Sequence, residues 1–212
     1  DFSFTTINYV MTMKKIIAET AAHIPLCVLD KPRSTLVLGE VVEEALLSEI
    51  ARHKTAITIC SLRGADFDYD ENAIVWKSGS ITTNAESLNE KYDAIVDLRG
   101  QKPNNDEAKA LLMKLSEGGV LLKAFGALDS ERLKAYQSCR FVIPCALSAF
   151  APLDGAINGY IFASKKPHPT ADLKLQKADM LDDLDYYSAE THNAAFAIPP
   201  FIFAQFGELI KN

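Results

Sequence analysis

The sequence predicts an α/β fold in which a mostly parallel sheet of about seven strands carries helices on both faces. Short continuous apolar runs, typical of buried parallel strands, alternate along the chain with stretches of helical periodicity. Two late apolar runs, at residues 141–147 and 160–163, follow each other without a helix between them, which indicates an antiparallel edge. Of the 212 residues, 48% are apolar and 24% are charged, a balance typical of a well-packed core.

Each expected element follows from a local pattern. The β-branched and aromatic residues between Phe2 and Val10 favour a strand. Residues 14–26 fit a helix with apolar residues along one stripe, ended by Pro25. Asp129 is the expected N-cap of a helix that runs to residue 137. Further strands are expected at residues 35–39, 56–60, 73–76, 92–98 and 118–122, and further helices at residues 43–53 and 107–115.

This order of elements predicts the methyltransferase-type variant of the Rossmann-like architecture, in which right-handed crossovers join parallel strands. Ligands of such sheets bind outside the carboxyl ends of the central strands. The residues that follow the strands at 35–39 and 92–98 are therefore the first candidates for a binding site.

Charge and cysteine usage exclude several classes of protein. The net charge of −6 argues against nucleic-acid binding, which needs a basic face, and it suits cationic ligands. No apolar run reaches the roughly 18 to 20 residues that span a bilayer. The four cysteines lie singly on apolar segments without a Cys-x-x-Cys pair, which predicts reduced, buried thiols and a cytoplasmic protein.

The last third of the chain carries its most unusual string, Tyr186-Tyr187-Ser188-Ala189-Glu190-Thr191-His192-Asn193-Ala194-Ala195-Phe196-Ala197-Ile198-Pro199. It resembles the C-terminal signature of the polyamine aminopropyltransferases, the spermidine synthase family. That signature reads Tyr-Tyr-Asn, three residues, His, one residue, Ala-Ala-Phe, one residue, Leu-Pro.

Two further segments resemble the same family, in the same order along the chain. Residues 19–26 keep the Glu, His, Pro and Leu of a family helix, here Glu19, His23, Pro25 and Leu26. Residues 159–165 resemble the family's last long strand, which reads Gly-(Phe/Tyr), three apolar residues, Ser-Lys. Three matches in the same order as in the family argue against a chance resemblance. The departures described below indicate a divergent bacterial member.

The resemblance implies an activity. The family transfers an aminopropyl group from decarboxylated S-adenosylmethionine to putrescine, which gives spermidine and methylthioadenosine. It implies no metal, no cofactor beyond that nucleoside co-substrate, and a homodimer or higher homo-oligomer. Family members carry a small antiparallel β domain ahead of the nucleotide-binding domain. Residues 1–13 are accordingly interpreted as a remnant of that domain, and residues 14–212 as the Rossmann-like domain.

The turn after the first parallel strand departs from the family. The family's glycine-rich turn, Gly-Gly-Gly-Asp-Gly-Gly, is replaced by residues 39–44, in which Gly39 survives and Val41 and Val42 add bulk. Two interpretations stay open: a structural turn, or a binding turn in which Gly39 approaches the nucleotide and Glu40 faces a cationic ligand. The carboxylate that takes the ribose hydroxyls after the second strand is also missing, and Asp66, Asp68 and Asp70 follow in what is predicted to be a surface loop.

The catalytic base of the family is the first Asp of Asp-Ser-(Ser/Thr)-Asp-Pro after the fourth strand. It accepts a proton from the attacking amine, which is a nucleophile only when neutral. Counting from Tyr92 places that position on Leu98, and Asp97 stands one residue early, on the opposite face of the strand. Asp97 is therefore either the base or a carboxylate that caps the strand end, and Gln101 is a candidate contact to the substrate.

On the polyamine side the resemblance assigns Tyr187 a catalytic role, with Tyr186, Glu19, His23 and His192 as substrate contacts. Aromatic faces and hydroxyl groups suit an alkyl chain with ammonium ends. The structural alternative is that the tyrosines and His192 dock the C-terminal helix against the sheet. Neither histidine belongs to a recognisable metal motif.

Two other functions compete with aminopropyl transfer. The loss of the glycines, of the ribose carboxylate and of a base in register favours a non-catalytic relative that serves in binding or assembly. A methyltransferase that uses S-adenosylmethionine is the second alternative, and the tail string argues against it. If Asp97 is not the base, Glu19 and Glu40 are the next candidates, since both flank the predicted cleft.

Overall fold

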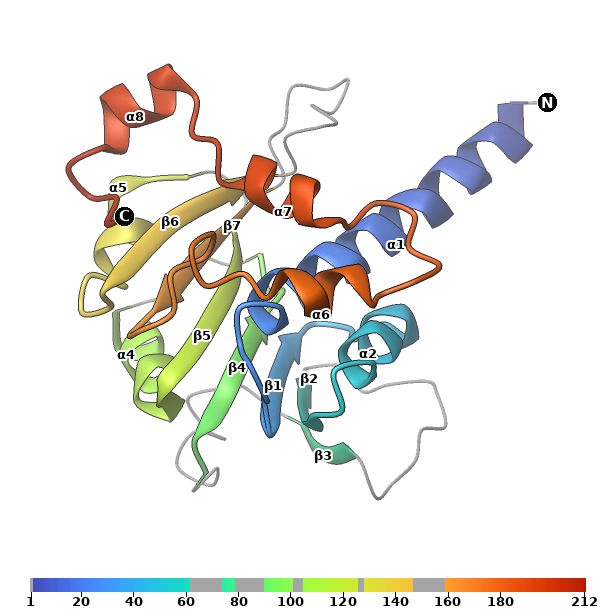
Figure 1. Ribbon diagram of the computed structural model, residues 1–212, viewed down its shortest axis with the longest axis horizontal. Helices are drawn as coiled ribbons and strands as arrows, with labels where there is room; N and C mark the ends of the chain where they lie inside the picture. Colours follow the sequence, from blue (N-terminus) through green and yellow to red (C-terminus); the bar gives the residue numbers. More distant parts are fainter. Residues whose placement is uncertain (1, 62–73, 79–89, 101–104, 126–127, 147–158) are drawn as a thin grey trace.

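The computed structural model describes residues 2–61, 74–78, 90–100, 105–125, 128–146 and 159–212; of residues 2–12, 61, 74–78 and 146 only the backbone is described. These residues form a seven-stranded sheet in the order β3-β2-β1-β4-β5-β7-β6, shown in Figure 1. Strands β1 to β5 run parallel to one another, and β7 is antiparallel to both β5 and β6. The strands are β1 Ser34–Gly39, β2 Ala56–Ser61, β3 Ile74–Ser78, β4 Tyr92–Asp97, β5 Leu115–Phe125, β6 Phe141–Ala146 and β7 Gly159–Ser164.

Helices cover both faces of the sheet (Figure 1). One apolar core lies between the sheet and α1, α2, α6 and α7, and a second lies between the sheet and α4, α5 and α8. Neighbouring strand residues alternate between the two cores, as Val37 and Leu38 of β1 do. The helices are α1 Phe2–Leu26, α2 Glu44–Ala51, α4 Asn105–Lys114, α5 Ser130–Lys134, α6 Leu175–Asp179, α7 Ala189–Ala195 and α8 Pro200–Phe206.

The predicted architecture is confirmed, including the antiparallel edge and the Asp129 cap, whose side chain accepts a hydrogen bond from the Arg132 N–H. The strand predicted between Phe2 and Val10 is wrong, because these residues form the first turns of α1. A helix that has nucleated extends at one hydrogen bond per residue, which outweighs the weak β propensity of a short segment. Residues 2–13 thus supply no strand to the predicted β remnant, and the domain boundary at residue 13 stays a prediction.

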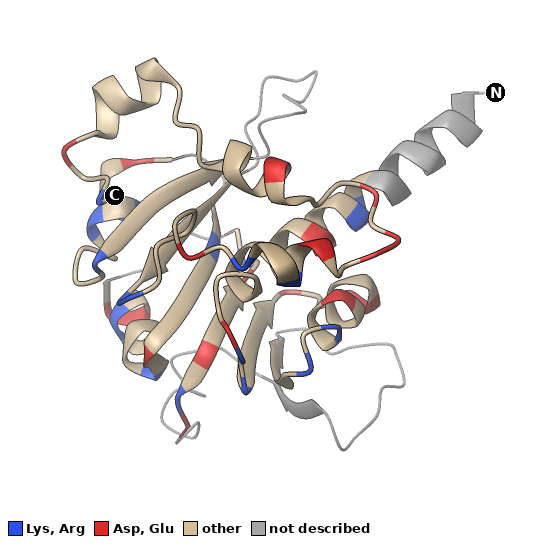
Figure 2. Cartoon of the chain, in the orientation of Figure 1, with Lys and Arg blue, Asp and Glu red and all other residues tan. Residues whose placement is uncertain are grey.

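The order of the strands places a candidate site. From β1 the sheet continues to β2 on one side, and from β4 it continues to β5 on the other. The chain therefore changes direction between β1 and β4, and the crevice at their carboxyl ends is where such folds bind ligands. In Figure 2 the charged residues lie mainly on helices and loops, and the strands are mostly uncharged. In the described part of the chain, no helix is long and apolar enough to cross a membrane.

Two adjacent glycines at the start of β5 provide a test of this packing. A Cβ on Gly119 would lie 2.8 Å from Leu115 Cγ and 3.0 Å from the Tyr92 carbonyl oxygen, whereas a Cβ on Gly118 would meet nothing within 4 Å. We expect Gly119→Ala to lower the free energy of unfolding by about 1–3 kcal/mol, because the backbone of β4 cannot give way. Gly118→Ala should be neutral or stabilising by up to about 1 kcal/mol. Denaturant titration of both variants checks this, and equal effects would contradict the strand packing.

Candidate functional site

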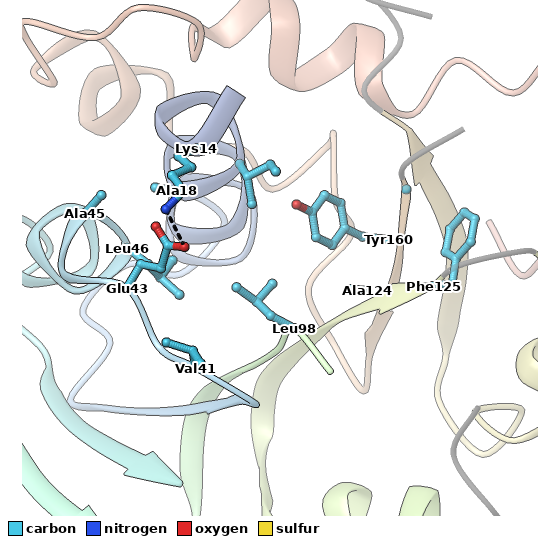
Figure 3. Close-up of a pocket in the computed structure, with 12 residues that line it drawn as sticks. Lys14, Ala18, Val41, Glu43, Ala45, Leu46, Leu98, Ala124, Phe125 and Tyr160 are labelled. Atoms are coloured by element: carbon cyan, nitrogen blue, oxygen red, sulfur yellow. Dashed lines mark ion pairs between the residues drawn. The ribbon is translucent and has the colours of Figure 1, made fainter. Parts of the chain in front are cut away.

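A cavity of about 290 Å³ opens at the predicted place, beside the carboxyl ends of β1 and β4. Its walls come from α1, from the turn that leads from β1 into α2, from the ends of β4 and β5 and from the start of β7 (Figure 3). The described residues that line it are Lys14, Ile17, Ala18, Val41, Glu43, Ala45, Leu46, Leu98, Ala124, Phe125, Gly159 and Tyr160.

Most of the described lining is apolar, and its polar groups are few. Lys14 Nζ and Glu43 Oε1 form an ion pair at 3.1 Å between α1 and the turn after β1. The Tyr160 ring projects into the cavity from β7 (Figure 3). Burial raises the pKa of the Tyr160 hydroxyl, so this group stays neutral and can serve as a hydrogen-bond donor. Such a lining suits the apolar and uncharged parts of a ligand.

The turn after β1 leaves no room for a side chain at Gly39. A Cβ on Gly39 would lie 2.9 Å from the Val41 carbonyl oxygen and 3.1 Å from Val42 Cγ2. Val42 is buried in the core on the α1 side of the sheet, while Val41 lines the cavity and is half exposed. Glu40 is exposed at the turn. The geometry thus gives Gly39 a packing role, and contact of Gly39 and Glu40 with a nucleotide remains a prediction.

At the end of β4 the two candidate positions point to opposite faces. The Leu98 N–H donates to the Leu38 carbonyl oxygen at 2.8 Å, so the ladder with β1 continues one residue past Asp97. Leu98 packs against the core on the α1 side and lines the cavity. Asp97 is fully buried on the other side. Burial, together with this nearby carboxylate, raises the pKa of Tyr136 of the second core. The family position of the base therefore faces the cavity as a leucine.

Both carboxylate oxygens of Asp97 are occupied. Arg99 donates to them from its backbone N–H at 3.0 Å, from Nε at 3.0 Å and from Nη2 at 2.8 Å. Lys123, the register partner of Asp97 on β5, lies 3.5 Å away and also donates to the Arg99 carbonyl oxygen. Arg99 Nη1 donates to Glu107 at 2.6 Å. Two carboxylates and two cations thus form a balanced buried cluster, and this geometry favours the strand-end role of Asp97 over that of a base.

The charges in this cluster depend on one another. Burial lowers the pKa of Lys123, and the Asp97 carboxylate opposes that shift. Against the effect of its own burial, hydrogen bonding to Asp97 raises the pKa of Arg99, so the guanidinium stays charged. The Tyr136 hydroxyl lies nearby and is buried without a hydrogen-bond partner. Removal of the Asp97 charge would leave buried cations uncompensated.

Glu19 ties the tail of the chain to α1. Its buried carboxylate accepts three backbone N–H groups, from Asp185 at 2.9 Å, Tyr186 at 2.8 Å and Tyr187 at 2.9 Å. Three hydrogen bonds to one carboxylate are the arrangement found where a helix side chain fixes a loop. Glu19 therefore positions the backbone of the tyrosine pair.

Tyr187 and His192 form a buried pair beneath α7. The Tyr187 hydroxyl lies 2.9 Å from His192 Nδ1, and His192 Nε2 lies 2.9 Å from the Pro169 carbonyl oxygen. Because a carbonyl only accepts, Nε2 carries the proton and Nδ1 accepts from the tyrosine. Burial lowers the pKa of His192 to about 4, which keeps the ring neutral. The His192 and Phe196 rings are 5.6 Å apart, and Phe196 meets Phe162 of β7 edge-on.

His23 joins a second buried chain of polar groups. Its Nε2 lies 3.1 Å from Glu49 Oε2 and its Nδ1 lies 2.9 Å from His53 Nε2. The hydrogen bond from His23 lowers the pKa of Glu49, and burial lowers the pKa of His53 to about 2. The His23 ring also contacts the Tyr187 ring at 4.9 Å. These side chains hold α1, α2 and the tail together.

The predicted site residues thus fall into two groups. Glu19, His23, Tyr187 and His192 meet in one buried network, and none of them lines the cavity. Their roles as catalytic or substrate-binding residues remain predictions. Tyr186 is partly buried, and it is not among the described residues that line the cavity. Gln101 lies outside the described residues, as do Asp66, Asp68 and Asp70. In the described part of the chain, no group of three or more His, Cys, Asp or Glu residues is arranged to hold a metal ion.

Sequence reasoning missed two charged residues and an aromatic one at the cavity. Tyr160 stands in a segment that resembles the family and Glu43 in the turn that departs from it, but neither pattern indicates that these side chains point inward. No pattern in the sequence pointed to Lys14. Its partner Glu43 is distant in sequence, and the pair forms only when α1 packs beside the turn after β1.

Comparison with known proteins supports the resemblance. No protein-family model matches the chain. A polyamine aminopropyltransferase of Helicobacter pylori (strain HPAG1) is 34% identical over 126 residues, which cover 58% of this chain and 47% of the relative. The spermine synthase of Arabidopsis thaliana is 26% identical and covers 92% of this chain and 64% of that protein. Over the matched residues the chain is similar to these polyamine aminopropyltransferases.

Solved structures agree with this family in fold. A spermidine synthase in complex with the transition state analogue AdoDATO has a TM-score of 0.75 at 20% identity and covers 92% of this chain and 74% of that one. Human methyltransferase-like protein 13 in complex with SAH has a TM-score of 0.52 at 16% identity, with 88% and 92% covered. The chain spans about half the length of the curated bacterial aminopropyltransferases that it matches.

The first prediction for this site concerns the Glu19 carboxylate, which holds the backbone of residues 185–187 and is called the Glu19 clamp below. Glu19→Gln should lower the free energy of unfolding by about 2–4 kcal/mol, because a neutral amide turns its NH₂ group toward at least one of three buried N–H donors. The control is Glu208→Gln, an exposed carboxylate of the same type, which should change stability by less than about 0.5 kcal/mol. Equal stability of the two variants in a denaturant titration would show that the clamp does not hold the tail.

The second prediction concerns the cluster around Asp97. Asp97→Asn should cost about 3–5 kcal/mol of unfolding free energy, because Lys123 and Arg99 are left partly unpaired in the core. Adding Lys123→Met removes one of those cations and should recover at least about 1 kcal/mol. Thermal and chemical unfolding of the single and double variants measures the coupling. Additive losses would rule out the charge balance described here.

The third prediction is a pH dependence. The folded pKa of His192, about 4, lies below the unfolded value of about 6.5, so the unfolded state binds the proton first as pH falls. The contribution of the neutral His192 ring to the free energy of unfolding is complete above pH 6.5 and is lost as pH falls toward 4. Between pH 6 and 5 the unfolding free energy of the wild type should fall more steeply than that of His192→Gln. The difference should approach about 1.4 kcal/mol per pH unit. Parallel pH profiles would contradict the neutral buried ring.

Proposed function

We propose that the protein transfers an aminopropyl group from decarboxylated S-adenosylmethionine to a small amine such as putrescine, giving spermidine and methylthioadenosine. The observation that carries the proposal is the apolar cavity at the carboxyl ends of β1 and β4, in a chain similar to aminopropyltransferases. The likeness in fold to a spermidine synthase crystallised with a transition state analogue is in keeping with it.

The chemistry suits the lining. A nitrogen lone pair of the amine attacks the carbon beside the sulfonium, the new N–C bond forms as the C–S bond breaks, and the sulfur leaves as neutral methylthioadenosine. The nitrogen then releases one proton to water or to a base. The positive charge moves from sulfur to nitrogen and is spread over both atoms in the transition state. Walls such as Leu98, Phe125 and Tyr160, which exclude water, favour this dispersed charge over the localised charge of the sulfonium. Positioning of the two reactants supplies the rest of the rate enhancement.

Among the described residues, no unpaired carboxylate faces the cavity to accept the proton that the amine releases. Asp97 is turned away from the cavity and paired with Arg99, and Leu98 occupies the position that faces the ligand. Glu43, the carboxylate among the described lining residues, is paired with Lys14. The geometry therefore supports slow transfer, in which the amine must arrive already neutral and the rate should rise with pH as the acceptor amine loses its proton.

The fourth prediction tests the activity by restoring a carboxylate. Wild-type protein given decarboxylated S-adenosylmethionine and putrescine should release methylthioadenosine slowly. Leu98→Asp should raise that rate by about 10²-fold or more at neutral pH, because it places a general base on the cavity side of β4. Leu98→Asn is the matched control, since it adds polarity without a base and should leave the rate near that of wild type.

Chromatographic measurement of methylthioadenosine over time decides between the outcomes. If wild type and Leu98→Asp both release none while remaining folded, transfer is ruled out and a binding role replaces it. A location in the cytoplasm and assembly as a homodimer or higher homo-oligomer remain predictions.

A further inference from the structure

The Tyr160 side chain brings a hydroxyl group into an apolar part of the cavity. Tyr160 is 4% exposed, and its ring projects from β7 toward α1 (Figure 3). In the part of the chain that the structure describes, no residue forms a hydrogen bond with this hydroxyl. Apolar residues line the neighbouring ends of β4 and β5, namely Leu98, Ala124 and Phe125. A buried hydroxyl without a protein partner is available to a ligand.

The position of Tyr160 in the sheet places it on the side of the second reactant. Nucleotides of such folds bind at the switch point between β1 and β4. From β4 the sheet continues through β5 to β7, where Tyr160 pairs with Ala124. In a direct displacement the amine approaches the carbon from the side opposite the sulfur, so it lies beyond the reacting carbon as seen from the nucleoside. The Tyr160 hydroxyl thus lies on the side of the crevice from which the amine would approach.

We propose that the Tyr160 hydroxyl oxygen accepts a hydrogen bond from the N–H of the attacking amine and orients the nitrogen lone pair toward the donor carbon. The inference rests on the proposed function and adds to it a residue that touches the reacting nitrogen. As the N–C bond forms and the C–S bond breaks, positive charge grows on nitrogen, and its N–H becomes a stronger donor. The hydrogen bond is therefore strongest in the transition state, which is the condition for an effect on kcat.

Tyr160 orients the amine and does not take its proton. Burial raises the pKa of the Tyr160 hydroxyl, so the group stays neutral. A neutral phenol accepts a hydrogen bond through its oxygen, but its basicity is far below that of a tyrosinate. The nitrogen therefore keeps its proton while the N–C bond forms and releases it to water afterwards.

Tyr160→Phe removes the hydroxyl and keeps the ring. With decarboxylated S-adenosylmethionine and putrescine, we expect kcat for methylthioadenosine release to fall by about 10-fold or more, as for the loss of a hydrogen bond to a charged group. KM for putrescine should change by less than about 3-fold, because the interaction forms mainly in the transition state. The dissociation constant of methylthioadenosine, measured by calorimetry, should stay within about 2-fold of wild type, since this ligand lacks the attacking amine.

Tyr136→Phe is the matched control. Tyr136 is buried like Tyr160 and its hydroxyl has no hydrogen-bond partner, but it belongs to the core on the other face of the sheet and does not line the cavity. The same atom is thus removed from a buried ring without a change at the cavity. We expect kcat, KM and methylthioadenosine binding of Tyr136→Phe to match the wild type. Thermal unfolding of the full chain confirms that both variants are folded.

The outcomes separate this inference from the function on which it rests. If wild type releases methylthioadenosine and Tyr160→Phe keeps kcat within about 2-fold of it, the role of Tyr160 is overturned and the proposed function stands. An equal loss of kcat in Tyr136→Phe would also overturn it, as would a loss of methylthioadenosine affinity in Tyr160→Phe as large as the loss of kcat. General packing would then account for the change. If folded wild type releases no methylthioadenosine, the proposed function fails and this inference falls with it.

Discussion

Neighbouring residues at the end of β4 cannot share a face of the sheet, and most of the site follows from this constraint. Leu98 extends the ladder with β1 and faces the cavity, so Asp97 must enter the opposite core. A carboxylate buried there needs partners, which Arg99 and Lys123 supply. The same alternation that gives the cavity its apolar floor therefore produces a charged cluster in the core behind it.

A second structural constraint is the junction between α1 and the C-terminal segment at residues 185–199. Glu19 holds the backbone of residues 185–187, and the Tyr187–His192 pair and the His23–His53 pair continue the network inward. These groups are hydrogen-bonded and buried, which rigidifies the wall from which the cavity lining of α1 projects.

Local patterns predicted the sheet well, because buried parallel strands are apolar along their whole length and the helices between them carry regular stripes. The same reasoning failed between Phe2 and Val10, where a weak strand propensity gave way to the extension of α1. At the site, the opposite orientations of Asp97 and Leu98 followed from strand geometry alone. The Arg99 pairing and the Lys14–Glu43 pair did not, since both depend on side-chain directions that only the folded chain sets.

We infer that ligands bind on the Leu98 side of β4, while Arg99 holds Asp97 on the other side. A crystal structure of the protein soaked with methylthioadenosine measures this most directly. We expect the nucleoside beside Leu98 and Tyr160, with the Asp97–Arg99 pair intact. A ligand in contact with the Asp97 carboxylate and a displaced Arg99, or a ligand at the other edge of the sheet, would contradict it.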